Sequence, residues 1–300
     1  MLIKFIITFL LVSTVISDEL NFCSSRGNCV CDCSWTKKVD CKTARDDNSC
    51  CFACCCLVKP TFPMNTGPNH QLYCPSVNDL VVGYGNAKLT NQGWLNKGGG
   101  SAATKSSFNL LGGYVEYDIE LTNVQPGINA NIYTISPKEI PTTIGFTQKN
   151  YCDGAKTGTN WCTEIDWIES NGNCGGATTL HMKEGTGVGC TAWGCSVTYK
   201  YNGNTNFHMK VAYEPDGTIT VYRDKEIYKK FTPTPTSTDM QVLIDQYKRL
   251  GAVIYSSLWK GWVPMGNSCP KNGDLQSSSF EIKNLKIFGT VVQGPIPKLC

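Results

Sequence analysis

The sequence WCTEIDWIESNG, residues 161–172, places three carboxylates within six residues, at Glu164, Asp166 and Glu169. Large apolar side chains stand between the acids, which is typical of a strand in a folded core rather than of a solvated loop. Such a strand rarely carries several acids unless a site requires them. We therefore take this segment as the candidate functional centre and expect the rest of the fold to be built around it.

The spacing of the three acids predicts an irregularity in the strand. Side chains of a strand alternate between its two faces, so Glu164 and Asp166 share one face and Glu169 would point to the other. One extra residue, a β-bulge at Trp167 or Ile168, would bring Glu169 to the face of the first two acids. Bulges are common beside active sites, so we expect all three carboxylates on one face of a sheet.

Three carboxylates on one face repel one another, and the repulsion separates their pKa values. A retaining glycosidase needs this separation, because one carboxylate attacks as the ionised form while another keeps a proton for the leaving group. The alternatives are a solvated edge strand and a calcium site. The interleaved apolar residues argue against the first, and calcium usually takes its oxygens from a loop, which argues against the second.

The flanking sequence is dominated by strand signals. In residues 114–121, YVEYDIEL, apolar and acidic residues alternate with the period of a half-buried strand. Asp216-Gly217 lies between two alternating runs and predicts a hairpin. A further strand is expected at residues 279–292, and one helix at residues 238–251, beginning near Thr238 and ending at Gly251. The pattern predicts an all-β fold, an antiparallel sandwich with one helix.

The N-terminal fifth has a different character. Residues 1–17 have a lysine followed by a short apolar run, as in a secretory signal peptide, the alternative being a membrane anchor. Residues 18–60 hold ten cysteines and few large apolar residues, so crosslinks must replace a core. Disulfides suit an exported chain, and a metal–thiolate cluster is the alternative. Residues 61–300 are expected to form the single β domain.

Eight cysteines belong to this β domain, and most of them surround the acidic segment. They are Cys74, Cys152, Cys162, Cys174, Cys190, Cys195, Cys269 and Cys300. An even number in an exported chain predicts disulfides that staple loops, with a pairing that sequence alone does not give. The net charge of +3, without any basic block, excludes nucleic acid and an anionic membrane surface as expected partners.

The acidic motif also resembles a known family. Glu-x-Asp-x-x-Glu on a strand is the signature of the laminarinases and related β-glucanases of glycoside hydrolase family 16, and of the family 7 cellulases in the same clan. Three flanking segments look like blocks of these families: residues 109–136, 206–228 and 241–259. Together the similarities cover most of residues 80–290. The resemblance implies a β-jelly roll of two curved antiparallel sheets, with substrate on the concave face.

Carried over residue by residue, the resemblance makes Glu164 the nucleophile, Asp166 its partner and Glu169 the general acid/base. Family 7 enzymes have a histidine shortly after the triad. His181 occupies about that place, one residue later than the pattern, and an ordinary histidine at a strand end is the alternative reading.

Substrate contacts are expected from aromatic and amide side chains. Flat apolar sugar faces suit aromatic platforms, for which we select Trp259 and Trp262 among five candidate tryptophans that also include Trp161, Trp167 and Trp193. Asn129 and Asn131, in the block before the acidic strand, complete the expected substrate-binding set. No metal and no cofactor are expected.

These observations predict a secreted, monomeric endo-β-glucanase that hydrolyses β-1,3 or β-1,4 bonds of a polysaccharide outside the cell or in a cell wall by the retaining mechanism. A non-catalytic carbohydrate-binding protein of the same fold is the first alternative, although binding alone does not need both glutamates. A glucan transglycosylase is the second, because its chemistry is the same up to the step at which water or a sugar accepts the intermediate.

Overall fold

The computed structural model describes residues 69–141, 151–154, 160–181, 195–232, 239–265 and 268–300. All of them belong to one of the two units into which the chain divides, Asn65–Cys300. The expected signal peptide, residues 1–17, and the cysteine-rich module, residues 18–60, lie outside the described residues and remain predictions. Within the described ranges, no helix has the length and apolar character needed to cross a bilayer.

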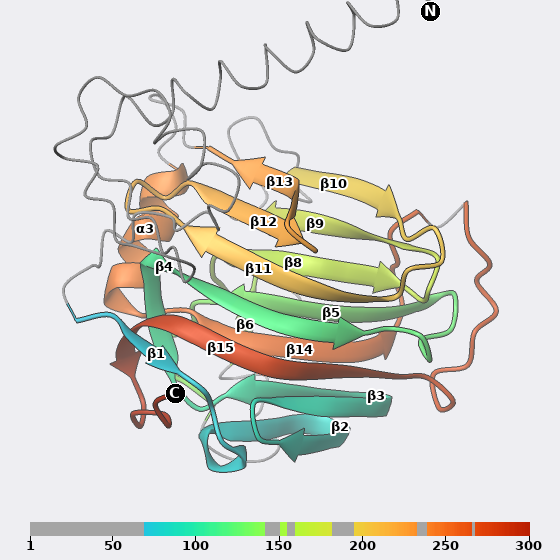
Figure 1. Ribbon diagram of the computed structural model, residues 1–300, viewed down its shortest axis with the longest axis horizontal. Helices are drawn as coiled ribbons and strands as arrows, with labels where there is room; N and C mark the ends of the chain where they lie inside the picture. Colours follow the sequence, from blue (N-terminus) through green and yellow to red (C-terminus); the bar gives the residue numbers. More distant parts are fainter. Residues whose placement is uncertain (1–68, 142–150, 155–159, 182–194, 233–238, 266–267) are drawn as a thin grey trace, which may run out of the picture. The chain divides into compact units, whose positions relative to one another are not determined.

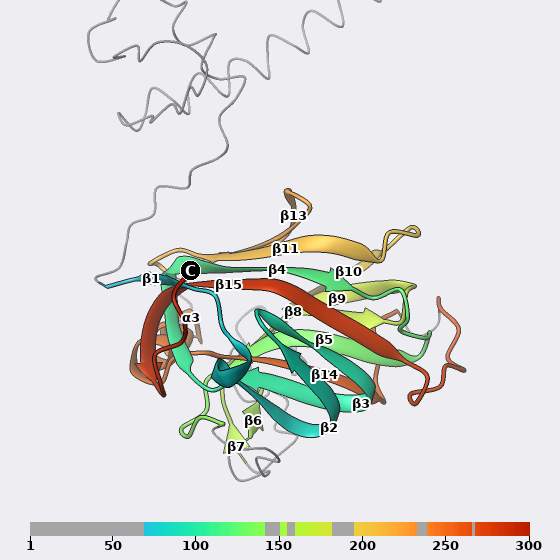
Figure 2. The ribbon, with the colours of Figure 1, turned by 60° about the horizontal axis from the view of Figure 1, so that its bottom comes forward.

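Antiparallel strands build two facing layers (Figures 1 and 2). The layer that holds the acidic strand, called the β8 layer below, consists in spatial order of β10 (Cys195–Lys200), β9 (Gly175–His181), β8 (Glu164–Asn171), β5 (Ile128–Ile135), β14 (Val253–Lys260), β3 (Gly93–Thr104) and β2 (Leu80–Thr90). The second layer, called the β4 layer, consists of β1 (Gln71–Tyr73), β15 (Ser279–Gln293), β4 (Ser107–Glu120), β11 (Asn206–Tyr213), β12 (Ile219–Arg223) and β13 (Glu226–Phe231).

Hydrogen bonding continues from one layer to the other, because β15 pairs with both β4 and β3. The expected two sheets are therefore one folded antiparallel sheet, and the all-β fold class is confirmed. The main core lies between the layers. Trp167 of β8 stacks on Tyr117 of β4 with ring centroids 5.8 Å apart, and its indole Nε1 donates to the Tyr213 hydroxyl at 2.7 Å.

Strand β4 shows how the sequence pattern produces this arrangement. Its apolar residues, among them Val115 and Ile119, are buried in the core. The acids between them face solvent and pair with β15, Glu116 with Lys286 at 3.0 Å and Glu120 with Lys283 at 3.1 Å. The predicted alternation of residues 114–121 is confirmed.

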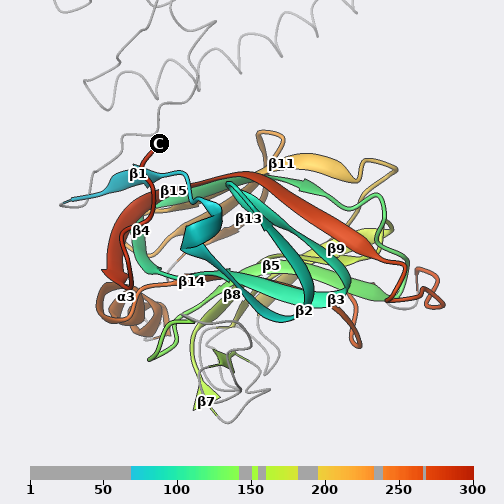
Figure 3. The same cartoon turned by 90° about the horizontal axis from the view of Figure 1, so that it is seen from below.

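The expected hairpin and helix are also present. Gly217 has φ +89° in the turn between β11 and β12, a conformation that favours glycine. Helix α3 (Asp239–Arg249) lies at one end of the layers in Figures 2 and 3 and ends before Gly251, which has φ +72°. The predicted cap, Thr238, lies outside the described residues.

A second, smaller apolar cluster lies on the other face of the β8 layer, the face turned away from the main core and called the outer face below. Its buried members are Val81, Ala103, Tyr133, Ile135, Cys152, Cys162, Val253 and Tyr255. Cys152 of the short strand β6 (Cys152–Asp153) belongs to it, and β6 pairs in parallel with β7 (Asn160–Trp161). Figures 2 and 3 show both on the side of the β8 layer opposite the β4 layer.

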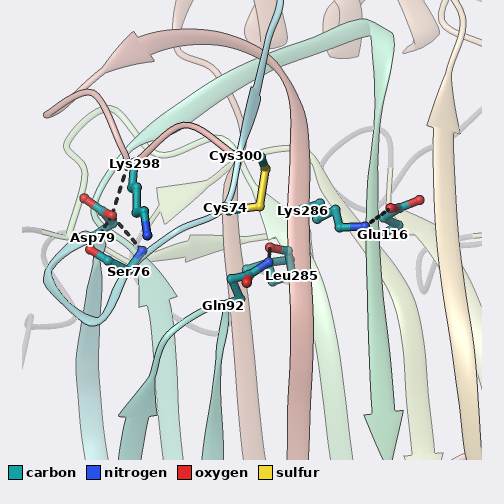
Figure 4. Close-up of a disulfide and its surroundings, with 9 residues drawn as sticks. All are labelled: Cys74, Ser76, Asp79, Gln92, Glu116, Leu285, Lys286, Lys298 and Cys300. Atoms are coloured by element: carbon teal, nitrogen blue, oxygen red, sulfur yellow. Dashed lines mark hydrogen bonds and ion pairs between the residues drawn. A yellow bond between two sulfur atoms is a disulfide. The ribbon is translucent and has the colours of Figure 1, made fainter.

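Three disulfides join described residues. Cys152–Cys162 closes a short loop beside the acidic strand, and Cys174–Cys269 links the turn after β8 to the segment after β14. Cys74–Cys300 links the start of the domain to its last residue (Figure 4). Cys190 and the side chain of Cys195 lie outside what the structure describes, so their pairing remains open. The expectation that cysteines staple loops beside the acids is confirmed for Cys152, Cys162 and Cys174.

The 3-10 helix η1 (Val77–Asp79) is held at the same end of the domain as Cys74–Cys300. The Asp79 carboxylate accepts hydrogen bonds from the backbone N–H groups of Ser76 and Lys298, at 2.8 and 3.2 Å. Backbone N–H groups of Cys74 and Cys300 also donate to the carbonyls of Lys298 and Leu72, so hydrogen bonds as well as the disulfide join the two ends of the β domain.

Candidate active site

The predicted bulge is present in β8. Ile132 of β5 pairs with Ile168, and the next residue of β5, Tyr133, pairs with Asp166, so Trp167 is the extra residue. The register with β9 shifts between Asp166 and Glu169 as well. The bulge sends the Trp167 ring into the main core and brings Glu169 to the outer face, beside the other two acids.

Burial, more than mutual repulsion, controls these acids. Glu164, Asp166 and Glu169 are only 7%, 3% and 8% exposed. Burial is the largest cause of the raised pKa of each carboxyl, which lies well above the ordinary value for Glu164 and Asp166. Repulsion between neighbours comes second: the charge of Asp166 raises the pKa of Glu164, and that of Glu169 raises the pKa of Asp166. The repulsion expected from the sequence is therefore present, and burial adds a larger effect that the sequence analysis did not consider.

Glu164 has contacts that favour its ionised form despite this burial. The backbone N–H of Gly154 donates to its Oε2 at 2.8 Å, and His181 opposes the rise of its pKa. Glycine is needed at position 154, because a Cβ there would lie 2.1 Å from the Cβ of His181. The loop therefore approaches Glu164 closely enough to hold the carboxylate by its backbone.

His181 lies at the end of β9, directly opposite Glu164 in the register. Its Nε2 lies 3.3 Å from Oδ2 of Asp166, and its charge lowers the pKa of both glutamates. The structure thus places His181 among the three acids, with its imidazole beside the central carboxylate. Its expected role in binding substrate remains a prediction.

Glu169 is held by two neighbouring strands. Asn129 of β5 donates through Nδ2 to Oε1 of Glu169 at 3.4 Å, and Thr179 of β9 donates through Oγ1 to Oε2 at 3.3 Å. Asn129 is fully buried and also donates to the backbone carbonyl of Trp262 at 3.1 Å. In this structure Asn129 orients the acid and the Trp262 segment, and it has no surface that a sugar could touch.

The other expected substrate-binding residues lie on the same face. Asn131 pairs with Glu169 in the register and accepts a hydrogen bond from the Ser257 hydroxyl at 2.6 Å. Trp259, opposite Asn129, is half-buried, and Gly261 lies against its ring. Trp262 is 59% exposed, so its ring is free to meet a ligand.

The remaining candidate tryptophans differ in position. Trp167 is fully buried in the main core, which removes it as a platform. Trp161 is half-buried in β7, and Trp193 lies outside the described residues.

Sequence reasoning missed a fourth acid. Asp153 of β6 is 4% exposed, and its charge raises the pKa of Glu164 and of Asp166. The motif gave no reason to select it, because it precedes the acidic strand by eleven residues. The only available signal was the Cys152–Cys162 pair, which fixes Asp153 and Gly154 beside the strand.

Among the described residues, Glu164, Asp166 and His181 have ligand atoms within 4.8 Å of one another, a spacing that a cation could bridge. Metal ligands must be deprotonated, whereas burial raises the pKa of both carboxyls. The same three residues are well suited to proton exchange, because two acids in different environments and a histidine lie close together, with the Gly154 N–H donating to one of the acids.

No protein-family model matches the chain, and no curated protein matches it. Several solved structures are similar to it. The laminarinase from Rhodothermus marinus aligns with 75% of this chain and 94% of its own, at 11% identity and a TM-score of 0.50. The cellobiohydrolase from Melanocarpus albomyces aligns over 70% and 80% (15% identity, TM-score 0.47), and the laminarinase from Flavobacterium sp. UMI-01 over 74% and 92% (14% identity, TM-score 0.44). The described chain therefore has the β-jelly-roll fold found in laminarinases, as the sequence resemblance predicted.

Proposed function

We propose that this protein is a secreted retaining glycoside hydrolase that cleaves internal β-glucosidic bonds of a polysaccharide. The observation that carries the proposal is the bulge at Trp167, which gathers three carboxylates on one face of the sheet. A bulge interrupts the ladder and buries charge, which costs stability, and such features persist at sites that use them. The shared fold with laminarinases supports the same reading.

Glu164 attacks the anomeric carbon and forms a covalent glycosyl–enzyme, while Glu169 gives its proton to the leaving oxygen. Water then enters, Glu169 takes a proton from it, and the bond to Glu164 breaks. Glu169 suits the acid role, because burial raises its pKa and so favours the protonated form that the first step needs. Its hydrogen bonds from Asn129 and Thr179 hold the carboxyl in place between these steps.

Glu164 must be ionised to attack, although burial raises its pKa. The neighbouring Asp166 resolves this conflict, because its own pKa is raised well above the ordinary value and it can hold a proton in the cluster. A neutral Asp166 no longer repels the charge on Glu164. The Gly154 N–H and His181 then favour the carboxylate form of the nucleophile.

The proposed substrate is a neutral β-glucan, in agreement with the small net charge and the exposed ring of Trp262. Disulfides suit an extracellular or cell-wall location, and the apolar segment at residues 1–17 would direct export. The protein would act as a monomer. Hydrolysis of β-1,3 or β-1,4 bonds is the proposed reaction, with transfer to a sugar as the other fate of the same intermediate.

The test compares Glu164→Gln, Glu169→Gln and Glu120→Gln, the last being a matched change on the β4 layer. With a panel of soluble β-glucans, both site variants should lose at least about 100-fold in kcat, as expected for an acid/base or nucleophile, while Glu120→Gln keeps the activity. With an aryl β-glycoside whose leaving group needs no proton, Glu169→Gln should still release the aryl group in the first step. Glu164→Gln should not.

Three results would contradict the proposal. Glu164→Gln that cleaves glucan at the wild-type rate would remove the assigned nucleophile. Product that is initially the α anomer by NMR would exclude retention. A wild-type protein that binds a glucan and turns over none of the panel would point to the carbohydrate-binding alternative. Products longer than the substrate would not contradict the mechanism, but they would identify transfer to a sugar in place of hydrolysis.

A further inference from the structure

The bulge in β8 leaves Trp167 without a partner residue in the two described strands beside it, β5 and β9. On the side of β9, the single residue Thr178 lies between the partners of Asp166 and Glu169. The extra residue of a bulge is left out of the regular ladder. Because Trp167 is fully buried, its backbone carbonyl requires a hydrogen-bond donor from elsewhere.

Thr178 provides this donor. Its hydroxyl donates to the carbonyl oxygen of Trp167 at 2.9 Å, and the threonine is itself fully buried. The hydroxyl of Tyr199 in β10 lies 3.3 Å from Oγ1 of Thr178. A threonine hydroxyl has one hydrogen, so Tyr199 donates and Thr178 accepts in this second bond. Burial raises the pKa of Tyr199, and the phenol therefore keeps the proton that the bond needs.

The next residue of β9 holds the acid that follows the bulge. Thr179 donates through Oγ1 to Oε2 of Glu169 at 3.3 Å. Thr178 and Thr179 are neighbours in one strand, so their side chains point to opposite faces of the sheet. One hydroxyl contacts the backbone of the bulge from the main core, and the other contacts the carboxyl on the outer face. Two consecutive threonines thus hold both the bulge and the acid that it displaces.

Other contacts on the core side of β8 hold side chains. The Trp167 indole donates to the Tyr213 hydroxyl, and the Ser170 hydroxyl shares a hydrogen bond with the Tyr201 hydroxyl. Such contacts can persist through rotation about side-chain bonds while the backbone between them shifts. The bond from Thr178, in contrast, ends on a main-chain atom of the bulge itself.

Resting on the proposed function, we infer that Thr178 is a positioning residue that fixes Glu169 relative to the other two acids. Glu164 and Asp166 precede the bulge and pair with β9 in an unbroken register. Glu169 follows the bulge, so its place beside them depends on the backbone conformation at Trp167. Without the Thr178 hydroxyl, the buried carbonyl loses its donor and the bulge relaxes. A general acid that moves away from the leaving oxygen transfers its proton more slowly.

The test compares Thr178→Val, which keeps the branched shape and removes the hydroxyl, with Thr178→Ser, which keeps the hydroxyl. Thr178→Ala is a second hydroxyl-free variant, so the test does not depend on the folding of one protein. Thr134→Val is the matched control. Thr134 lies in β5 of the same layer, is fully buried, and shares a hydrogen bond at 2.8 Å with Tyr247 of α3 instead of with the bulge.

Each variant is assayed on a soluble β-glucan and on two aryl β-glycosides, one whose leaving group needs a proton and one whose leaving group does not. Thr178→Val and Thr178→Ala should lower kcat/KM roughly tenfold, equivalent to about 1.4 kcal/mol, on the glucan and on the first glycoside. On the second glycoside kcat/KM should be unchanged, because the first step there does not use the proton of Glu169. Thr178→Ser and Thr134→Val should retain wild-type values on all three substrates.

Wild-type kinetics of Thr178→Val on the glucan would overturn the inference. An equal loss on both glycosides would also overturn it, because that result indicates general damage to the site, and so would a Thr178→Ser variant as impaired as Thr178→Val. Circular dichroism identifies the variants that are folded at the assay temperature.

A wild-type protein that cleaves none of the three substrates would refute the proposed function by itself. Thr178 is then judged by hydrogen exchange, read by mass spectrometry on peptides that cover β8, residues 164–171. These peptides should exchange faster in Thr178→Val than in the wild type and in Thr134→Val. Equal exchange in the three proteins would show that the hydroxyl does not hold the bulge.

Discussion

The two disulfides Cys74–Cys300 and Cys152–Cys162 should differ in what their removal does. Loss of the first should reduce stability more, and loss of the second should reduce activity more. The crosslinks close stretches with sequence separations of 226 and 10 residues. In the chain-entropy model, the loss of each crosslink destabilises the folded state by about 5.4 and about 2.7 kcal/mol respectively at 25 °C. Cys74→Ala/Cys300→Ala should therefore lower the free energy of unfolding about twice as much as Cys152→Ala/Cys162→Ala.

The loss of activity should depend on how close each disulfide lies to the acids, and not on the length of chain that it closes. Cys152–Cys162 holds the loop whose Gly154 N–H donates to Glu164 at 2.8 Å. A hydrogen bond to a charged group contributes about 1.5–3 kcal/mol, so its loss should reduce kcat by roughly 10- to 100-fold. Cys74–Cys300 joins two segments of the β domain whose contacts do not include the acids, so its removal should leave kcat unchanged at temperatures where the variant is folded.

The assay pairs urea denaturation followed by tryptophan fluorescence with kcat on a soluble glucan, for both variants and the wild type. Unfolding curves with unchanged slopes are needed, because a changed slope would mean a changed unfolded state. The reasoning is refuted if the Cys74/Cys300 variant loses kcat as strongly as the Cys152/Cys162 variant, or if the latter keeps full activity. An equal loss of stability in both would show that chain entropy does not set these magnitudes.

Other outcomes follow from the same structure. The three site acids have raised pKa values in the folded protein, so protonation favours folding: this stabilisation is complete below about pH 4, the ordinary range of carboxyls, and is lost as pH rises through the raised values. Asp166→Asn should accordingly raise the melting temperature at pH 7.5 and weaken its dependence on pH, and calorimetry that shows no gain would contradict the burial argument. Trp167→Ala should cost about 3–5 kcal/mol by urea denaturation, because it empties the stack on Tyr117. A chain that starts near Thr61 should fold and cleave soluble glucan; if circular dichroism shows a folded protein without activity, residues 18–60 contribute to the site.

Most of the fold could be predicted from local patterns. The alternation in β4, the Asp216-Gly217 hairpin and the helix before Gly251 each follow from a period or a turn residue in a short stretch of sequence. Even the bulge at Trp167 could be predicted, because a simple strand would have placed one of three acids in the core. These features are local, and the residues that determine them are neighbours in the chain.

The parts that could not be predicted depend on distant contacts. Asp153 and Gly154 reach Glu164 only because the loop returns to β8, and no pattern in their own segment marks them. The burial of Asn129 depends on the segment that carries Trp262. The dominance of burial over repulsion in the acid pKa values likewise required knowledge of how the outer face is covered, which the alternation of one strand does not contain.

The join between the two ends of the β domain has a mechanical consequence. A pull applied between the residues before Cys74 and Cys300 is carried by the disulfide, through two side chains (Figure 4). The strands between these two cysteines are bridged by the disulfide, so such a pull does not unravel them while the sulfur–sulfur bond is intact. A protein anchored at one end to an insoluble polymer could thus be stretched while the geometry of its acids is undisturbed, until the sulfur–sulfur bond is reduced.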